Sequence, residues 1–318
     1  MVVRLRAHGL LGEMAAEFAG TMILILFGVG VVAQVVAGGL GNHDSIAWAW
    51  GFGVALGVYT AGKVTGGHLN PAVTLSLAIF SGFPWKKFLP YALAQTAGAF
   101  VAALIVRWVY NSVLVNFDPH HTLKSQGVFS TLPGNGFEHV SLWGAFLDQI
   151  VGTAILLFCV FAITDSRNTS PLSNMAPVVV GFLVVAIGMA WGTNAGYAIN
   201  PARDFGPRLA SYFTGYSTAW RDQYGQLYWW VPIVAPLLGG VLGAFLYKVL
   251  IDTFLPAAEP GAPIEGTPAA ETTVASGQVL AEGDEAGGQR STGRDTGDPG
   301  SGSGFGTDEP GNPRGPSA

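Results

Sequence analysis

Residues 65–74 read TGGHLNPAVT and residues 196–208 read GYAINPARDFGPR, so the tripeptide Asn-Pro-Ala occurs twice, as Asn70-Pro71-Ala72 and as Asn200-Pro201-Ala202. Asparagine is a strong helix N-cap and proline is favoured at the first helical position, so each tripeptide predicts the start of a helix. The stretches that follow, about 70–81 and 200–212, are too short to cross a bilayer. We predict two short helices, each preceded by a glycine-containing loop.

Six longer apolar segments surround these two starts. Half of the 318 residues are hydrophobic and only 11% are charged, whereas about a quarter of the residues in soluble domains are charged. Each segment is close to the length that a helix needs to cross the hydrocarbon core: about 14–36, 46–63, 88–110, 143–165, 175–193 and 229–251. The expected fold class is an all-α membrane protein with six transmembrane helices and two re-entrant half-helices.

The order of the segments indicates an internal repeat. Glu17-Phe-Ala-Gly20-Thr21 aligns with Gln149-Ile-Val-Gly152-Thr153, and each lies at nearly the same distance before its Asn-Pro-Ala. Each half, about 14–110 and 143–251, holds three spans and one half-helix. Because three is odd, the second half must enter the bilayer inverted relative to the first, an arrangement that builds a site at the midplane.

Composition divides the chain into three parts: a short polar lead at 1–13, a channel domain at 14–252, and a tail at 253–318. The tail is rich in Gly, Pro, Ser and acidic residues and is expected to be disordered. The tail carries a net charge of −7 and the rest of the chain +2, so the total of −5 is a property of the tail. The near-neutral remainder argues against a nucleic-acid partner. The distribution of Lys and Arg between short loops predicts that both termini are cytoplasmic and that the 111–142 loop is extracellular.

Two half-helices that enter from opposite faces would bring their N-termini together at the membrane centre. Each N-terminus offers unpaired N–H groups and about half a positive charge, which disfavours cations there, protons included. With the Asn70 and Asn200 carboxamide oxygens capping the helices, we expect their NH2 groups to be free to donate to a passing hydroxyl or water. Loop carbonyls would supply acceptors along one wall, since irregular backbone at this depth is tolerated where it lines a wet cavity. The pattern favours a pore for small neutral hydroxylated molecules.

Other classes of function have less support in the sequence. An ion-coupled transporter can share an inverted repeat, but it would need a titratable midplane group, for which Glu17 is the one reasonable candidate. No feature favours a structural junction protein with a closed pore. We find no nucleophile–base pair or metal constellation, and Cys159 is a lone cysteine, so neither an enzyme nor a metal or organic cofactor is expected.

The two Asn-Pro-Ala segments closely resemble the aquaporin (major intrinsic protein) family, and specifically its glycerol-conducting branch, the aquaglyceroporins. The resemblance covers about residues 10–252. It implies a homotetramer in the bilayer, with one pore per subunit conducting glycerol and water, and a location in the plasma membrane is expected. A water-dominant aquaporin is the alternative within the same family.

The resemblance also implies a selectivity filter at Trp50, Gly188, Tyr197 and Arg203. Arg203 would donate hydrogen bonds to adjacent hydroxyls while repelling cations; an Arg paired with a loop acid is the alternative. Position alone would make Trp50 and Tyr197 packing or interfacial residues. Water-selective relatives have His at the position of Gly188, so glycine there is expected to widen the pore. Tyr197 stands where the bacterial glycerol facilitator pattern has Phe.

The remaining expected site residues support the loops. The resemblance implies that Glu17 accepts backbone N–H groups of the first pore loop and that Gln149 does the same for the second. Asp204 is used as a marker of the glycerol branch, its chemistry being explained by the helix dipole. His68 is expected to be a packed residue that holds its loop rather than a ligand or proton shuttle. The carbonyls expected along the pore belong to Gly66, Gly67, His68, Ala195 and Gly196.

Overall fold

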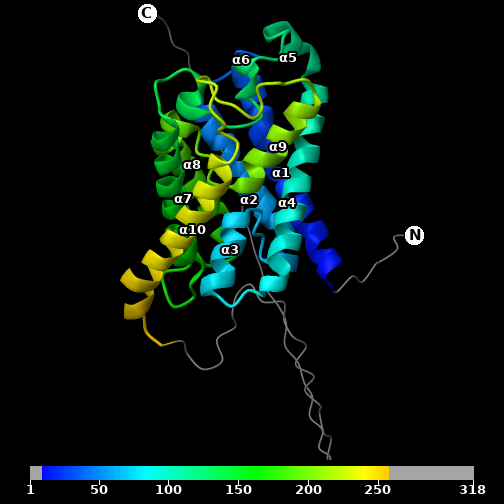
Figure 1. Cartoon of the computed structure of the whole chain (residues 1–318). Helices are drawn as coiled ribbons and strands as arrows, with labels where there is room; N and C mark the ends of the chain where they lie inside the picture. The colour runs from blue at the N-terminus through cyan, green and yellow to red at the C-terminus, as the bar shows by residue number, and fades with distance from the viewer. Residues whose placement is uncertain (1–8, 258–318) are drawn as a thin grey trace, which may run out of the picture. The chain divides into compact units, whose positions relative to one another are not determined.

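A computed structural model describes residues 9–257, and within that range the chain is helical (Figure 1). The helices are α1 (Leu10–Val36), α2 (His43–Thr65), α3 (Pro71–Phe80), α4 (Trp85–Val109), α5 (Asn111–Phe117), α6 (Leu123–Gln126), η1 (Pro133–Gly136), α7 (Leu142–Thr164), α8 (Ala176–Ala195), α9 (Pro201–Phe213), α10 (Val231–Leu250) and η2 (Asp252–Phe254). Residues 9–257 contain no strand, only an isolated bridge between Arg221 and Leu227. The first helix begins inside the predicted 1–13 lead, and nearly all of the predicted tail lies outside the described residues.

By length and composition, five of the described helices could cross a membrane: α1, α4, α7, α8 and the helix that starts at Val231. The sixth predicted span corresponds to α2, which has 23 residues but is not apolar enough to be among the five. It nevertheless packs along both α1 and α8. The role of α2 as a sixth span therefore follows from its place between two apolar helices rather than from its composition.

The packing of the helices follows the predicted repeat. In the first half α1 packs on α2 and α4, and in the second half α7 packs on α8 and α10. Gly98 and Gly239 occupy equivalent places, because a Cβ at Gly98 would overlap the Phe18 carbonyl and one at Gly239 the Ile150 carbonyl. Glycine at these two positions lets α4 approach α1, and α10 approach α7, at backbone contact.

The two half-helices are exchanged between the halves. The α3 helix packs chiefly on α10 and the α9 helix chiefly on α4, so each short helix completes the half to which it does not belong. In Figure 1, α3 lies toward the lower end of the long helices and α9 toward the upper end. The two helices therefore run inward from opposite ends.

Large apolar side chains are exposed along the helices, and several polar side chains are buried between them. Large apolar side chains such as Leu93, Trp108 and Leu147 are exposed, whereas Glu17 and Gln95 are fully buried. Burial of polar groups requires hydrogen bonds, and an exposed apolar surface of this extent requires an apolar surrounding. This distribution fits a bundle that lipid surrounds.

Candidate functional site

The first pore loop, residues 66–70, is held by Glu17 of α1. The Glu17 carboxylate accepts from the backbone N–H groups of His68 at 3.0 Å and Leu69 at 2.8 Å. It also accepts from the Thr65 hydroxyl at 2.6 Å and from Gln95 Nε2 at 2.8 Å. Four donors therefore surround a carboxylate that is fully buried, and the loop is fixed to α1 as the resemblance implied.

The second pore loop, residues 196–200, is held by Gln149 of α7 in an equivalent way. Gln149 Oε1 accepts from the backbone N–H of Ile199 at 2.9 Å, and Nε2 donates to the Ala195 carbonyl at 2.9 Å. Glu17 has two acceptor oxygens, whereas the Gln149 amide has one acceptor and one donor. The second loop therefore presents one carbonyl and one N–H to Gln149, where the first loop presents two N–H groups to Glu17. The Ala195 carbonyl was expected along the pore, but it is directed at buried Gln149. The carbonyls of Gly66, Gly67, His68 and Gly196 accept no hydrogen bond from residues 9–257.

The backbone of the two loops repeats even where the residue types differ. Counting back from the Asn of each tripeptide, φ is positive at the first, third and fourth residues: Leu69, Gly67 and Gly66 in one loop, and Ile199, Tyr197 and Gly196 in the other. A non-glycine residue in this region costs about 1–3 kcal/mol and persists where its surroundings hold it. Glu17 and Gln149 provide that hold, because each binds the backbone N–H of the residue before the Asn.

Asn70 and Asn200 join the two loops at the point where the half-helices begin. Asn70 Oδ1 caps α3 at Ala72 N, and Asn200 Oδ1 caps α9 at Ala202 N and Arg203 N. Asn70 Nδ2 donates to the Ile199 carbonyl at 2.9 Å, and Asn200 Nδ2 donates to the Leu69 carbonyl at 2.8 Å. The expectation that both NH2 groups are free was therefore wrong for one N–H of each group. One N–H of each crosses to the opposite loop, and the other has no acceptor among residues 9–257.

Trp50 and Arg203 pack against each other. The guanidinium carbon of Arg203 lies 3.9 Å from the centroid of the Trp50 ring. Both residues are at least 92% buried, and the Arg203 side chain makes no hydrogen bond or ion pair with residues 9–257. The alternative in which Arg203 pairs with a loop acid is thus contradicted. A buried guanidinium without an acceptor among residues 9–257 keeps its five N–H donors unused.

Tyr197 packs directly on Gly188. A Cβ at Gly188 would lie 2.9 Å from Tyr197 Cζ and 3.1 Å from Ala47 Cβ. Gly188 therefore does not leave open space, as the sequence had suggested, because the Tyr197 ring fills it. The Tyr197 hydroxyl and Trp50 Nε1 are buried and have no hydrogen-bond partner among residues 9–257. With Arg203, this region combines two aromatic faces with three polar groups whose hydrogen bonds are unused.

Asp204 has a larger role than the helix dipole alone would give it. Its carboxylate accepts from Thr131 N and Thr131 Oγ1, both at 2.7 Å, and from Arg208 Nε at 2.8 Å. Arg208 in turn donates to the carbonyls of Ala219 and Thr131 at 2.6 and 2.7 Å. Both partners of this ion pair are fully buried. Sequence reasoning missed Arg208 and Thr131, although the i, i+4 spacing of Asp204 and Arg208 was a usable signal.

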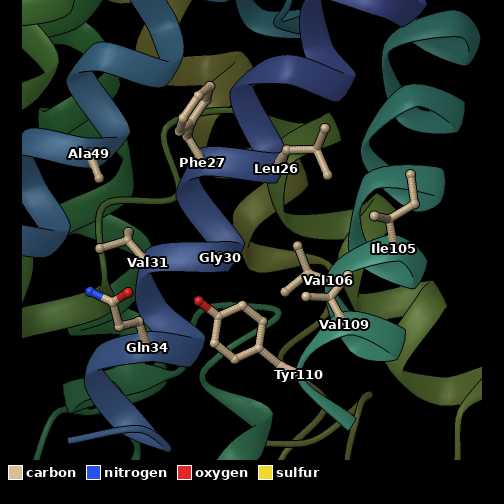
Figure 2. Close-up of a pocket in the computed structure, with 10 residues that line it drawn as sticks. All are labelled: Leu26, Phe27, Gly30, Val31, Gln34, Ala49, Ile105, Val106, Val109 and Tyr110. Atoms are coloured by element: carbon tan, nitrogen blue, oxygen red, sulfur yellow. The ribbon is translucent and has the colours of Figure 1, made fainter. Parts of the chain in front are cut away.

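Two further features lie outside this arrangement. His68 is packed, as expected, with Nδ1 3.1 Å from Thr74 Oγ1 and its ring beside Phe83 and Tyr91. Residues 9–257 contain no group of His, Cys, Asp and Glu side chains that could hold a metal ion. A cavity of about 370 Å³ lies between α1, α2 and α4 (Figure 2). Its lining shares no residue with the loops: Leu26, Phe27, Gly30, Val31, Gln34, Ala49, Ile105, Val106, Val109 and Tyr110.

Comparison with known proteins agrees with this geometry. The sequence model of the family described as "Major intrinsic protein" matches residues 4–247. The chain is 46% identical to the probable aquaglyceroporin-2 of Gibberella zeae over 248 residues, which cover 75% of this chain and 72% of that protein. It is 42% identical to the glycerol uptake facilitator protein of Pseudomonas aeruginosa over 269 residues, which cover 81% of this chain and 95% of that protein.

A solved structure has the same arrangement of helices. The X-ray structure of the aquaglyceroporin from Plasmodium falciparum superposes with a TM-score of 0.69 at 31% identity, covering 77% of this chain and 98% of that chain. The predicted all-helical, aquaporin-like membrane fold is thereby confirmed, as is the resemblance stated from the two motifs. The chain belongs to the major intrinsic protein family, and the relatives described above are named aquaglyceroporins or a glycerol uptake facilitator.

Proposed function

We propose that this protein is a passive transmembrane channel that conducts glycerol and water, and that it excludes ions and protons. The observation that carries the proposal is the buried guanidinium of Arg203, which lies on the Trp50 ring and has no acceptor among residues 9–257. Such a site offers donors on one side and an aromatic face on the other, which suits a polyol with hydroxyls along a carbon chain. The relatives named for glycerol transport support the same assignment.

The roles of the individual site residues belong to the same proposal. Asn70 and Asn200 each keep one N–H for a solute, and Trp50, Gly188, Tyr197 and Arg203 form the selectivity filter. The free carbonyls of Gly66, Gly67, His68 and Gly196 serve as acceptors along the pore. Glu17 is an unsuitable proton carrier for an ion-coupled transporter, since its carboxylate already accepts four hydrogen bonds from the protein.

The direct test is stopped-flow light scattering on proteoliposomes that contain the purified protein, with empty liposomes as the baseline. Glycerol and water permeability above that baseline, unchanged when proton and sodium gradients are collapsed by ionophores, is the expected result. Glycerol flux that needed an ion gradient would instead establish a coupled transporter. Water flux without glycerol flux would establish a water-dominant aquaporin.

Assembly and orientation are further parts of the proposal. A homotetramer in the plasma membrane, with both termini cytoplasmic, agrees with the family and with the Lys and Arg distribution between the loops. Native mass spectrometry in detergent tests the tetramer. Protease accessibility of tags at the two termini in sealed cells tests the orientation, because tags outside the cell would be cleaved without lysis.

Gly188 provides a prediction about the filter. Gly188→Ala and Gly188→His are expected to push the Tyr197 ring from its place, since the added Cβ would come within 2.9 Å of Tyr197 Cζ. The displaced ring narrows the passage, so glycerol permeability should fall by about tenfold, with a smaller loss for water. Gly30→Ala is the matched control, because a Cβ at Gly30 meets nothing within 4 Å. An unchanged glycerol-to-water ratio in both Gly188 variants would contradict the assignment.

Arg203 provides a prediction about ion exclusion. Arg203→Val removes the one filter charge, so proton leakage should rise by at least about tenfold, since a charge close to the path contributes several kcal/mol to the barrier. The measurement is decay of a pH gradient reported by a dye trapped in proteoliposomes. Arg221→Val, which alters an exposed arginine bonded to the Gly225 carbonyl, should leave the decay unchanged. If the pH gradient decayed at the same rate in both variants, Arg203 would not be the main barrier to protons.

A further inference from the structure

His43 stands at the outer end of a stripe of α2 that includes the filter residue Trp50. His43, Ala47 and Trp50 follow one another at helical spacing and so share one face of α2. Trp50 and Ala47 are buried, whereas His43 is exposed. The stripe therefore runs from the filter to the solvent-exposed end of the helix, with His43 as its outermost member.

The facing helix, α8, presents bare backbone to this stripe. Gly188 and Gly192 lie one turn apart, and a Cβ at Gly192 would come within 2.5 Å of His43 Cε1 and 2.6 Å of Nε2. The same Cβ would lie 3.5 Å from Tyr197 Cδ1. The His43 and Tyr197 rings thus share the surface that the two glycines leave, with their centroids 6.3 Å apart and their planes at 87°.

A hydrogen bond fixes the His43 ring in this place. Nε2 lies 2.9 Å from the carbonyl oxygen of Gly188, and because a carbonyl only accepts, Nε2 is the donor. In the neutral ring Nδ1 is then an acceptor, and it has no hydrogen-bond partner among residues 9–257. The ring is anchored to the backbone of one filter residue and lies edge to face with the ring of another.

We propose that His43 is a fifth residue of the constriction, an outer wall that limits the size of the solutes that pass. The proposal rests on the channel function proposed above. A solute that approaches Tyr197 passes the His43 ring first, and the Nδ1 acceptor complements the donors of Arg203 deeper in the pore. His43 determines specificity because its ring limits the size of the solutes that pass. The hydrogen bond to the Gly188 carbonyl holds the ring in position.

The test compares two substitutions of opposite size in proteoliposomes, with water, glycerol and erythritol permeability measured on each preparation. His43→Ala removes the ring, so the erythritol-to-water ratio should rise by about fivefold, and His43→Trp enlarges it, so the glycerol-to-water ratio should fall by about as much. Water permeability should stay within about twofold of wild type in both. His120→Ala, which alters an exposed histidine of the loop after α5, is the control and should leave all ratios unchanged.

The outcomes separate the role of His43 from a structural role and from the channel function itself. Ratios that move in opposite directions for His43→Ala and His43→Trp support the proposal. Ratios that stay at the wild-type value, or permeabilities that all fall together in both variants, overturn it, since a merely structural residue would not change selectivity. If the wild-type protein conducts neither glycerol nor water, the channel function fails, and the proposal for His43 fails with it.

Discussion

Glu17→Ala is expected to lower the free energy of unfolding by about 3–5 kcal/mol, because the backbone N–H groups of His68 and Leu69 would remain buried without an acceptor, at about 1–3 kcal/mol each. The Thr65 hydroxyl and Gln95 Nε2 would lose the same carboxylate. The first pore loop should then leave its strained conformation, and glycerol permeability should disappear with it. Thermal and denaturant unfolding in detergent, followed by reconstitution, measures both effects.

Two variants make the Glu17 prediction sharper. Glu13→Ala, one turn earlier on α1, removes a partly exposed carboxylate bound to Lys87 and Tyr91 and should cost about 1 kcal/mol or less. Glu17→Gln keeps one acceptor oxygen, so it should lie between wild type and Glu17→Ala. Equal stability of the Glu13→Ala and Glu17→Ala proteins would show that the loop does not depend on this carboxylate.

Arg208→Met is expected to destabilise the protein by about 3–5 kcal/mol, because it leaves the Asp204 carboxylate buried without its counter-charge. Glycerol permeability should fall as well. Asp204 holds the loop that contains Thr131, and Thr131 and Asn135 lie against Gly196 of the second pore loop. Asp204 also follows Arg203 directly, so loosening this cluster should disturb the filter. Unfolding free energy and glycerol permeability are the two measurements.

The double variant Asp204→Asn, Arg208→Met tests the electrostatic origin of that loss. With neither charge buried, it should recover a measurable part of the stability. Measuring Asp204→Asn alone completes the double-mutant cycle and gives the coupling between the two residues. Lys87→Met, which breaks the partly exposed pair with Glu13, is the matched control and should cost about 1 kcal/mol or less. A double variant no more stable than Arg208→Met would mean that packing, not charge, is lost.

The parts of the fold that depend on local chemistry could be predicted from the sequence. Helices α3 and α9 begin at Pro71 and Pro201, as Asn-Pro-Ala implied, because capping involves only neighbouring residues. Apolar length located the long helices to within a few residues. The inverted repeat followed from the odd number of spans in each half.

The parts that depend on distant contacts could not be predicted. The Asn70 side chain reaches the Ile199 carbonyl, and nothing near residue 70 indicates that this acceptor is present. Tyr197 fills the space at Gly188 with its ring and has a φ of +36°, a conformation that tyrosine rarely adopts. His43 acquires its contacts only when α2 packs on α8, and Thr131 acquires its contact with Asp204 only when its loop folds onto α9. In each case the partner lies too far along the sequence for local pattern to reveal it.

The hydrogen bonds that Asn70 and Asn200 make to the opposite loops can form only after the second loop has been synthesised. The acceptor of the Asn70 carboxamide lies 129 residues later in the chain. At ribosomal speeds of about 5–20 residues per second, Asn70 therefore waits roughly 6 to 26 seconds for its partner to be made. During that interval the first half of the protein carries a re-entrant loop with exposed polar groups, which hydrocarbon does not tolerate. The insertion machinery or water must therefore keep these polar groups out of the hydrocarbon until residues 196–203 have been synthesised and inserted.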